Sequence, residues 1–224
     1  MANKKKKIAL FDFCDTLVSF QTANEYVRFY VKNYATLSVR WRHFIYLFLS
    51  ASGIISRLEK KNPIRNTRKR ILLWQLKGCS KDKMEMAAQE YYEKRIKPNL
   101  IRETIVALLK CQKEGRKVII VSGGYDIYIK YFAREYGIAF SDIISNQLLF
   151  NKSSFVGEFD LDCMGEEKVK ILRKRFVCRE NFDVEAYSDS ESDLPMLQWA
   201  DIAYVVTPYS FAKLYNFYEI RYVK

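Results

Sequence analysis

The stretch from Ile8 to Leu17 constrains the fold more than any other part of the chain, because an apolar run ends there at an acidic residue. Ile8 to Phe11 are consecutive apolar residues, and Asp12 follows them at once. Such a run is typical of a strand buried on both faces, as in a parallel α/β sheet. Ligands bind at the carboxyl ends of such strands. The stretch therefore predicts a parallel α/β fold with a functional carboxylate at Asp12.

Polar residues after two further strand patterns supply what phosphorus chemistry at an aspartate requires, namely a cation and donors for the phosphoryl oxygens. The apolar run from Val118 to Val121 ends in Ser122-Gly123-Gly124 before a helix pattern, where a hydroxyl and backbone N–H groups can bind an anion. Asp189 and Asp193 follow another strand pattern. Clustered carboxylates repel one another unless a cation lies between them, so we expect a Mg²⁺ site.

Each of these residues also has a simpler interpretation. The two glycines can serve a tight turn, and Asp189 or Ser190 can cap a helix. Lys168, at the start of a later helix pattern, can be one more surface lysine. The residue types alone leave these alternatives open.

Four motifs in chain order resemble those of the haloacid dehalogenase (HAD) superfamily. They are Asp12-x-x-x-Thr16, Ser122-Gly123-Gly124, Lys168 and Asp189-x-x-x-Asp193. Each motif alone is weak, but four in this order rarely coincide by chance. The resemblance implies a Rossmann-like core with a parallel sheet, formed by residues 1–17 and 98–224. It also implies an all-helical cap, residues 18–97, inserted between the first and second motifs.

The resemblance implies a role for each matching residue. Asp12 would be the nucleophile and would form an aspartyl-phosphate. Four groups would orient and neutralise the phosphoryl group: the side chains of Thr16, Ser122 and Lys168 and the N–H of Gly123. Four positions would hold or steady the Mg²⁺: Asp12, the backbone carbonyl of Cys14, Asp189 and Asp193.

Cys14 departs from the family pattern. Phosphatases of the superfamily carry an aspartate two residues after the nucleophile as general acid and base, and Cys14 occupies that position. Asp15 is no obvious substitute, because successive side chains of an extended segment point to opposite sides. General acid–base help is typically worth ~10²–10⁴-fold in rate. We therefore expect a slow phosphatase, a phosphatase for a good leaving group, a phosphotransferase, or a low-activity protein that binds anionic surfaces.

Within the superfamily, the chain resembles the phosphoserine-phosphatase-like branch, which includes bacterial lipid-phosphate phosphatases such as the type C phosphatidylglycerophosphate phosphatase. The resemblance rests on the Ser122 to Asp126 turn, the helical cap and the stretch from Tyr187 to Leu197. The phosphoserine enzymes have a glutamate nine residues after the nucleophile to bind the substrate ammonium, and here that residue is Gln21. A neutral amide loses most of that attraction. We expect a small-molecule or lipid phosphate substrate other than phosphoserine, and no nucleic-acid partner.

The net charge of +12 is concentrated in one segment of the expected cap. Between Arg28 and Lys81 the chain has thirteen Lys or Arg residues and one acid, Glu59. Such a segment is either a solvated basic face or a surface for an anionic partner. Because arginine binds phosphate bidentately, we expect the substrate to be selected by arginines of this segment, together with Gln21. The candidates are Arg40, Arg42, Arg57, Arg65, Arg68 and Arg70.

The same segment contains an apolar block, Phe44 to Leu49, that is too short for a bilayer span of ~20 residues. We interpret it as a helix buried in the cap's own core, because aromatic stripes usually pack. The alternative is a helix in a membrane interface with its basic flanks on lipid headgroups. The five cysteines are widely spaced without a C-x-x-C pair, which indicates reduced thiols. We expect a cytoplasmic protein, peripheral at the inner face of the membrane under the alternative.

Local patterns predict the remaining elements. Thr22 or Asn24 is expected to cap the first cap helix, and a basic helix is expected from Ile64 to Leu76. Another helix is expected from Lys81 to Ile96. The apolar runs of 148–150 and 155–159 predict a β-hairpin.

Overall fold

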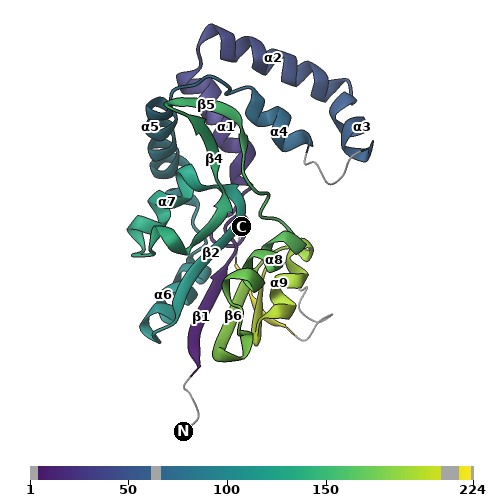
Figure 1. Cartoon of the computed structure of the whole chain (residues 1–224). Coiled ribbons are helices and arrows are strands. Elements are labelled where there is room, and N and C mark those ends of the chain that lie inside the picture. Colours follow the sequence, from purple (N-terminus) through teal and green to yellow (C-terminus); the bar gives the residue numbers. More distant parts are fainter. Residues whose placement is uncertain (1–4, 62–66, 208–216, 223–224) are drawn as a thin grey trace.

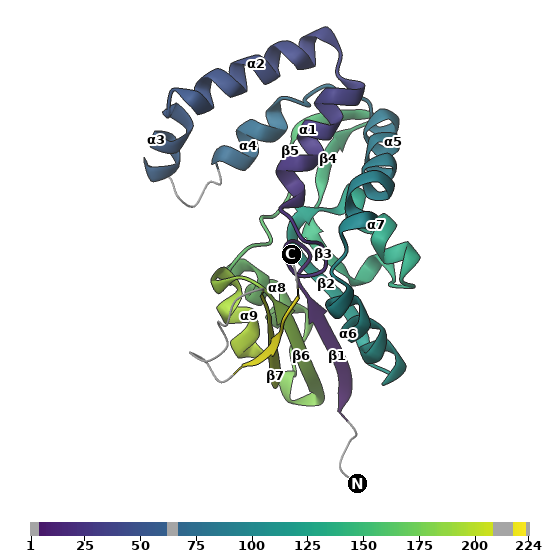
Figure 2. The same ribbon diagram turned by 180° about the vertical axis from the view of Figure 1, so that it is seen from behind.

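The computed structural model describes residues 5–61, 67–207 and 217–222 of the chain. One half of the molecule is a parallel sheet with helices on both faces, which we call the core (Figure 1). The other half, which we call the cap, consists of helices that the chain forms between the first and second strands (Figures 1 and 2). The predicted fold class, an α/β core with an inserted helical cap, is confirmed.

The core sheet has β1 at its centre, between β2 and β6. Its order is β3-β2-β1-β6-β7-β8, and every pairing is parallel. The strands are β1 (Lys6–Phe11), β2 (Lys117–Tyr125), β3 (Ile143–Asn146), β6 (Phe182–Ser188), β7 (Ile202–Val206) and β8 (Tyr218–Ile220). Ile8 and Leu10 pack into one apolar cluster, and Ala9 and Phe11 into another. The central strand is therefore buried on both faces, as its uninterrupted apolar run predicts.

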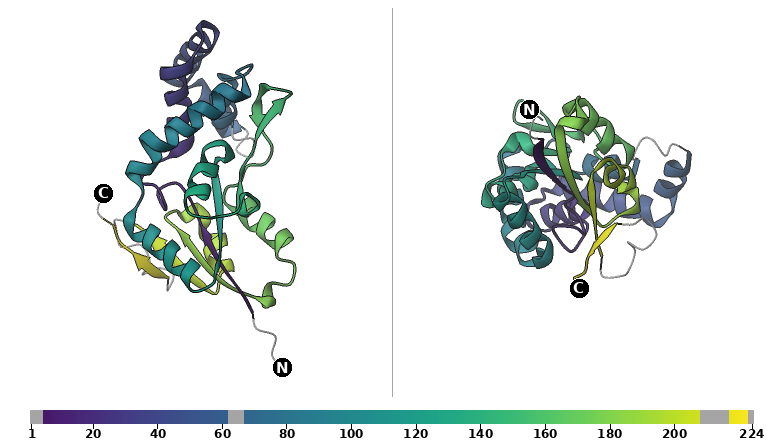
Figure 3. Two further views of the ribbon diagram at one scale, coloured as in Figure 1. Left: turned by 90° about the vertical axis from the view of Figure 1, so that its left-hand side faces the viewer. Right: turned by 90° about the horizontal axis from the view of Figure 1, so that it is seen from below.

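Helices cover both faces of this sheet. In the side view of Figure 3, α6 and α8 lie on opposite sides of the strands. The core helices are α6 (Arg102–Lys113), α7 (Asp126–Glu135), α8 (Glu166–Arg175) and α9 (Leu194–Trp199), with short 3-10 turns η3 (Lys97–Asn99), η4 (Phe140–Asp142), η5 (Arg179–Asn181) and η6 (Glu191–Asp193). This arrangement leaves the carboxyl ends of β1, β2 and β6 pointing toward the cap (Figure 1).

The cap contains five α-helices and one π-helical turn among the described residues. They are α1 (Thr22–Tyr34), α2 (Leu37–Ala51), α3 (Ile54–Lys61), α4 (Thr67–Trp74), α5 (Lys81–Tyr91) and η2 (Tyr92–Ile96). The helix expected from Ile64 is described only from Thr67 onward, because residues 62–66 lie outside the described part of the chain. The helix expected from Lys81 to Ile96 is present, with its last turn π-helical.

The start of α1 differs from the sequence-based prediction. Gln21 occupies the N-cap position and no side chain caps the helix, so the prediction that Thr22 or Asn24 does so is wrong. The Thr22 hydroxyl is instead buried between two other polar groups, 3.0 Å from Cys14 Sγ and 2.8 Å from the Tyr128 hydroxyl. These tertiary contacts replace the hydrogen bond that the Thr22 hydroxyl was expected to make at the helix start.

The predicted hairpin is present as β4 (Leu148–Asn151) and β5 (Ser154–Phe159), which pair antiparallel. The sequence of the hairpin does not show that it hydrogen-bonds to the segment between α4 and α5. The Gly78 N–H donates to the Phe155 carbonyl at 2.8 Å, and the Phe155 N–H donates to the Cys79 carbonyl at 2.9 Å. This hairpin of the core therefore contributes backbone hydrogen bonds to the cap.

A cluster of tyrosines joins the cap to the core. Tyr26 of α1, Tyr91 of α5 and Tyr128 of α7 are buried, and their ring centroids lie 5.4 to 5.6 Å apart. The same apolar cluster continues from these rings to Phe13 and Phe132 beside the sheet. One side of the cap is therefore packed firmly against α7.

The apolar block of α2 is exposed. Phe44, Leu47 and Phe48 have 61%, 50% and 64% of their surface accessible, so the interpretation of this block as the cap's buried core is wrong. The reason is position: α2 is the outermost helix of the cap (Figures 1 and 2), and Val39 is its one buried residue. Among the described residues, no helix combines the length and the apolar character that crossing a membrane requires.

Candidate active site

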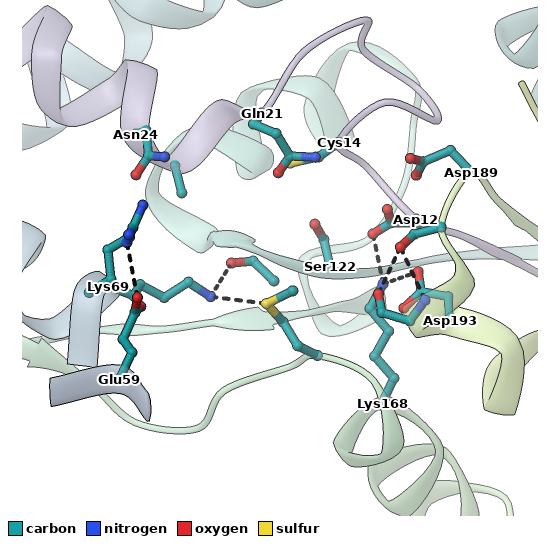
Figure 4. A pocket seen from close by; sticks show the side chains of 16 residues that line it. Asp12, Cys14, Gln21, Asn24, Glu59, Lys69, Ser122, Lys168, Asp189 and Asp193 are labelled. Carbon is teal, nitrogen blue, oxygen red and sulfur yellow. Dashed lines mark hydrogen bonds and ion pairs between the residues drawn. The ribbon is translucent and has the colours of Figure 1, made fainter. Parts of the chain in front are cut away.

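The carboxyl ends of three strands and the first turn of α8 meet at one cavity of about 340 Å³ between core and cap (Figure 4). Asp12 directly follows β1, and Asp189 directly follows β6. Ser122 lies at the end of β2, where the pairing with β3 shifts register. Lys168 comes from the start of α8. The core residues that line the cavity are Asp12, Cys14, Ser122, Gly123, Met164, Lys168, Asp189, Ser190, Ser192 and Asp193.

A buried ammonium lies between two carboxylates on the core side of this cavity (Figure 4). Lys168 Nζ donates to Asp12 Oδ1 at 2.8 Å and to Asp193 Oδ2 at 2.6 Å. The Ser188 hydroxyl donates to the same oxygen of Asp193 at 2.6 Å. Asp193 is thereby held behind Lys168, where it orients the ammonium toward Asp12.

Burial and charge shift the acid–base behaviour of this group of residues. Burial raises the pKa of Asp12 to about 6, although the Lys168 ammonium lowers it in part. Burial lowers the pKa of Lys168, but the Asp12 and Asp193 carboxylates raise it more, so the pKa lies above its usual value. The ammonium therefore stays charged, and it favours the carboxylate form of Asp12 that a nucleophile requires.

Asp189 faces Asp12 from the neighbouring strand end. Its carboxylate accepts from the Thr16 hydroxyl at 3.0 Å, and its backbone N–H donates to the same hydroxyl at 3.0 Å. Burial and then repulsion from Asp12 raise the pKa of Asp189 to about 7. Thr16 is fully buried behind Asp189 and outside the cavity lining, so its expected contact with a phosphoryl group stays a prediction.

The donor set fits a hard divalent cation. Two carboxylates, Asp12 and Asp189, repel each other here, and a cation between them would lower both pKa values. No group of three His, Cys, Asp or Glu side chains suited to a metal occurs in the described part of the chain. A bound Mg²⁺ would thus take two carboxylates, a backbone carbonyl such as that of Cys14, and waters, which it readily keeps.

The Cys14 thiol is a poor acid at this position. It is 8% exposed, and burial, followed by the charge of Asp12, raises its pKa to about 12. Asp15 adopts a positive φ of 51° and does not line the cavity, and its carboxylate accepts from Nε2 of the lining residue Gln21 at 2.7 Å. Neither residue can therefore take the place of the usual acid and base.

The end of β2 offers donors to an anion. Ser122 Oγ accepts from the Gly124 N–H at 3.1 Å, so the hydroxyl proton is directed elsewhere. A Cβ on Gly123 would lie 2.6 Å from Met164 Cγ and 3.1 Å from its Sδ, and both residues line the cavity. A side chain at this position would therefore require the Met164 side chain or the backbone of Gly123 to move.

The cap side of the cavity is formed by α1, α3 and α4, through the residues Gln21, Ala23, Asn24, Glu59, Arg68 and Lys69. Of the arginines expected to select the substrate, Arg68 alone lines the cavity among the described residues, and it pairs with Glu59 at 3.3 Å. The others lie elsewhere or outside the described residues: Arg40 and Arg57 are exposed, Arg42 lies over the Trp74 ring, Arg70 pairs with Glu158, and Arg65 is not described. The helical period spreads these residues over several faces, so they do not form one surface toward the cavity.

Lys69 reaches the site although no sequence pattern singled it out. Its Nζ (Lys69 in Figure 4) donates to the Gly123 carbonyl at 2.9 Å. It also donates to Asp162 Oδ1 at 2.8 Å. Asp162 also accepts from Asn146 Nδ2 at 3.2 Å. In the sequence Lys69 is one of three consecutive basic residues, so only the fold distinguishes it from its neighbours.

Comparison with known proteins agrees with this geometry. Residues 9–198 match the family of haloacid dehalogenase-like hydrolases. The chain belongs to this family. The phosphoserine phosphatase of Methanocaldococcus jannaschii is 27% identical over 211 residues, 89% of this chain and 84% of that protein. The resemblance drawn from the motifs, including the phosphoserine-phosphatase-like branch, is confirmed, as is the prediction of a hydrolase.

A partial sequence match and two solved structures extend this comparison, and the two structures share the fold. An uncharacterized protein of Mycobacterium tuberculosis is 32% identical over 97 residues, 42% of this chain, and the chain spans about a third (33%) of that relative. A protein of unknown function from Bordetella pertussis has a TM-score of 0.79 at 16% identity, covering 96% of this chain and 98% of that one. A phospho-aspartyl intermediate analogue of phosphoserine phosphatase has a TM-score of 0.60 at 24% identity, with 91% and 87% covered.

Proposed function

We propose that this chain is a Mg²⁺-dependent phosphatase that cleaves a phosphate monoester through an aspartyl-phosphate at Asp12. The observation that carries the proposal is the buried Lys168 ammonium, which lies between Asp12 and Asp193 beside the cavity. Phosphoryl transfer depends on positioning and on charge stabilisation, and a fixed ammonium beside the nucleophile supplies both. The name of the archaeal relative, a phosphoserine phosphatase, supports the same class of reaction.

The cavity residues divide the reaction between them. The Asp12 carboxylate forms a bond to phosphorus while the bond to the leaving oxygen breaks. Ser122 and the Gly123 N–H donate to the phosphoryl oxygens, and Lys168 balances their charge. A Mg²⁺ held by Asp12, Asp189 and the Cys14 carbonyl would add positive charge against the same oxygens. Water then cleaves the aspartyl-phosphate, which releases inorganic phosphate and restores Asp12.

The substrate is an anionic phosphate ester, such as a sugar, lipid or other small phosphate. Arg68 and Lys69 give the cap side of the cavity positive charge. Gln21, at the position where the phosphoserine enzymes have glutamate, donates its amide to Asp15 and carries no charge to attract an ammonium. Phosphoserine is therefore a poor substrate in this proposal.

The neutral thiol of Cys14 has two consequences for the reaction. A leaving group must depart without a proton from this position, so aryl phosphates react faster than alkyl phosphates. Hydrolysis of the aspartyl-phosphate also lacks a general base, so the intermediate persists longer. An alcohol bound in the cavity can then compete with water for it, which makes phosphotransferase activity the alternative function. Product analysis with glycerol added separates the two, because transfer yields glycerol phosphate in place of inorganic phosphate.

The test is phosphate release from an aryl phosphate and from a panel of sugar and lipid phosphates, with Mg²⁺ and with chelator. Asp12→Asn should abolish release, whereas the exposed Asp82→Asn should not change it. Activity that survives in Asp12→Asn, or that chelator leaves unchanged, would refute the proposal.

A further inference from the structure

The outer face of α2 is apolar although nothing in the described structure covers it. Residues on a helix are offset by about 100°, so positions 37, 41, 44 and 48 share one face. These residues are Leu37, Trp41, Phe44 and Phe48, and between 61% and 85% of their surface is accessible. Trp41 and Phe44 stack on each other with ring centroids 6.0 Å apart. We call these four residues the outer face.

The opposite face of α2 already satisfies the helix's need for burial. Val39 is 1% exposed, and Tyr46 packs against the same apolar cluster. His43 Nδ1 lies 2.6 Å from Gln75 Oε1. Positions 39, 43 and 46 lie about half a turn from the outer face. The helix is therefore apolar on two faces. The face with Val39 and Tyr46 attaches it to the rest of the cap, so the outer face is not needed for that attachment.

The charged residues of α2, Arg40 and Arg42, are both basic. From Tyr26 to Leu58 the chain contains five Lys or Arg residues and no acid. Arg40, beside the outer face on α2, and Arg57, on α3, are exposed. In α3, Ile54 and Leu58 continue the exposed apolar side chains with 38% and 42% of their surface accessible.

We propose that the outer face docks peripherally on an anionic lipid surface, with α2 lying in the membrane interface. An amphipathic helix with aromatic and aliphatic residues between basic neighbours inserts its apolar face at the headgroup boundary, where the basic residues meet lipid phosphates. A second copy of the chain fits less well, because a symmetric pairing would bring two like-charged surfaces together. The proposal stands independently of the phosphatase reaction.

Docking has a consequence for the cavity. α2 contacts α3, and α3 contacts α4. Glu59 of α3 and Arg68 and Lys69 of α4 line the cavity. Docking through α2 therefore attaches to the lipid surface the part of the cap that carries Glu59, Arg68 and Lys69.

The experiment is co-flotation of the full chain with vesicles of phosphatidylcholine alone or with added phosphatidylglycerol. Binding should require the anionic lipid and should weaken as salt shortens the screening length from ~10 Å at ~0.1 M to ~3 Å at ~1 M. Trp41→Ser/Phe44→Ser/Phe48→Ser should lower binding by more than about tenfold. The matched control, Phe140→Ser/Val177→Ser, removes two exposed apolar side chains of the core and should leave binding unchanged.

A charge variant and a spectroscopic signal keep the test independent of any folding defect. Arg40→Glu/Arg57→Glu should lower binding by about tenfold or more, and Arg173→Glu/Lys174→Glu on exposed positions of α8 should have little effect. In a Trp74→Phe/Trp199→Phe background, the emission of Trp41 should shift to the blue with anionic vesicles. Equal binding to neutral vesicles, no flotation, or a stable dimer that buries Trp41 would each overturn the proposal.

Discussion

At the scale of single residues, the site is a problem of charge balance. One ammonium, Lys168, contacts two carboxylates. A third carboxylate, Asp189, faces Asp12, and within the described part of the chain its side-chain donor is the Thr16 hydroxyl. Burial, and then repulsion from Asp12, raises the pKa of Asp189 to about 7. Adding the dianion of a phosphate ester to this site would be unfavourable without further positive charge. A divalent cation between Asp12 and Asp189 would supply that charge, which is why the proposed reaction includes Mg²⁺.

The most informative single substitution is Cys14→Asp. It places a carboxyl group at the position of the missing acid, and turnover of alkyl phosphates should rise by about tenfold to a hundredfold, within the range of general acid–base catalysis. Aryl phosphates should gain less, because their leaving groups need no proton. Steady-state kinetics on both substrates measures the difference. Cys14→Asn, similar in size but without a transferable proton, is the control, and an equal gain in that variant would contradict the explanation.

Gly123→Ala tests the close approach at the end of β2. The new Cβ would lie 2.6 Å from Met164 Cγ, so either the Met164 side chain or the segment whose N–H is proposed to bind phosphate must shift, and both line the cavity. We expect kcat/KM for an aryl phosphate to fall by about tenfold or more, since an error near 1 Å in positioning costs as much as a hundredfold. Removing most of the Met164 side chain in the double variant Gly123→Ala/Met164→Ala should restore part of the lost kcat/KM. Failure to recover would show that glycine matters here for another reason.

At the scale of elements, the sequence predicted what depends on local chain chemistry. Asp12 and Asp189 were found because a polar residue after a buried strand has a fixed place in a parallel sheet. The predicted N-cap residue of α1 was wrong because the Thr22 hydroxyl has tertiary partners, Cys14 and Tyr128, that no local sequence pattern contains. The hairpin was predicted, but its pairing with Cys79 was not, since hydrogen bonds between distant segments leave no local signal.

The apolar periodicity of α2 did not show which of its two apolar faces is buried. Apolar residues on two faces of one helix predict a helix without saying which face is buried. Phe44 and Phe48 looked like core residues, and Val39 and Tyr46 proved to be the residues that pack. Only the outer position of α2 in the cap decides between the faces.

Asp126 at the start of α7 gives a prediction for stability. Its carboxylate accepts from the Leu148 N–H at 3.2 Å, and burial raises its pKa from 3.8 to about 6. The folded state therefore binds this proton more tightly than the unfolded state. The stability that this group contributes is fully present below pH 3.8 and is lost as the pH rises through about 6.

Asp126→Asn removes this loss, because the amide stays neutral and its oxygen can still accept from the Leu148 N–H. The free energy of unfolding of the variant, relative to the wild type, should rise between pH 3.8 and about 6 and then level off. Urea unfolding across this range measures it. Asp82→Asn, an exposed aspartate in the first turn of α5, is the control for the loss of a charge at a helix start. A difference between variant and wild type that does not change with pH would disprove this account.

At the scale of the whole molecule, cap and core are joined by apolar packing, by backbone hydrogen bonds to the β4–β5 hairpin and by polar contacts at Lys69. The tyrosine cluster of α1, α5 and α7 is apolar and buried, whereas α4 approaches the cavity through polar contacts at Lys69. Apolar burial holds one side of the cap in place. On the other side, α4 contacts the core through the ion pair of Lys69 with Asp162 and through β5, where Leu72 and Leu73 share an apolar cluster with Phe155. Both partners of the ion pair are largely buried, with 15% and 16% of their side-chain surface accessible, so this pair is less screened than a surface pair.

Lys69→Met should weaken the hold of the cap over the cavity without unfolding the chain, because methionine keeps most of the apolar length beside Phe159, whose ring lies 5.5 Å from Nζ. We expect faster hydrogen exchange in α4, unchanged exchange in α1 and α5, and a fall of about tenfold in kcat/KM, carried mainly by KM. Asp162→Asn should act in the same direction. If the ion pair is the cause, the double variant loses about as much as either single variant, since the second change removes a contact already lost. Additive losses in that cycle would mean that Lys69 acts on the substrate directly and does not hold the cap.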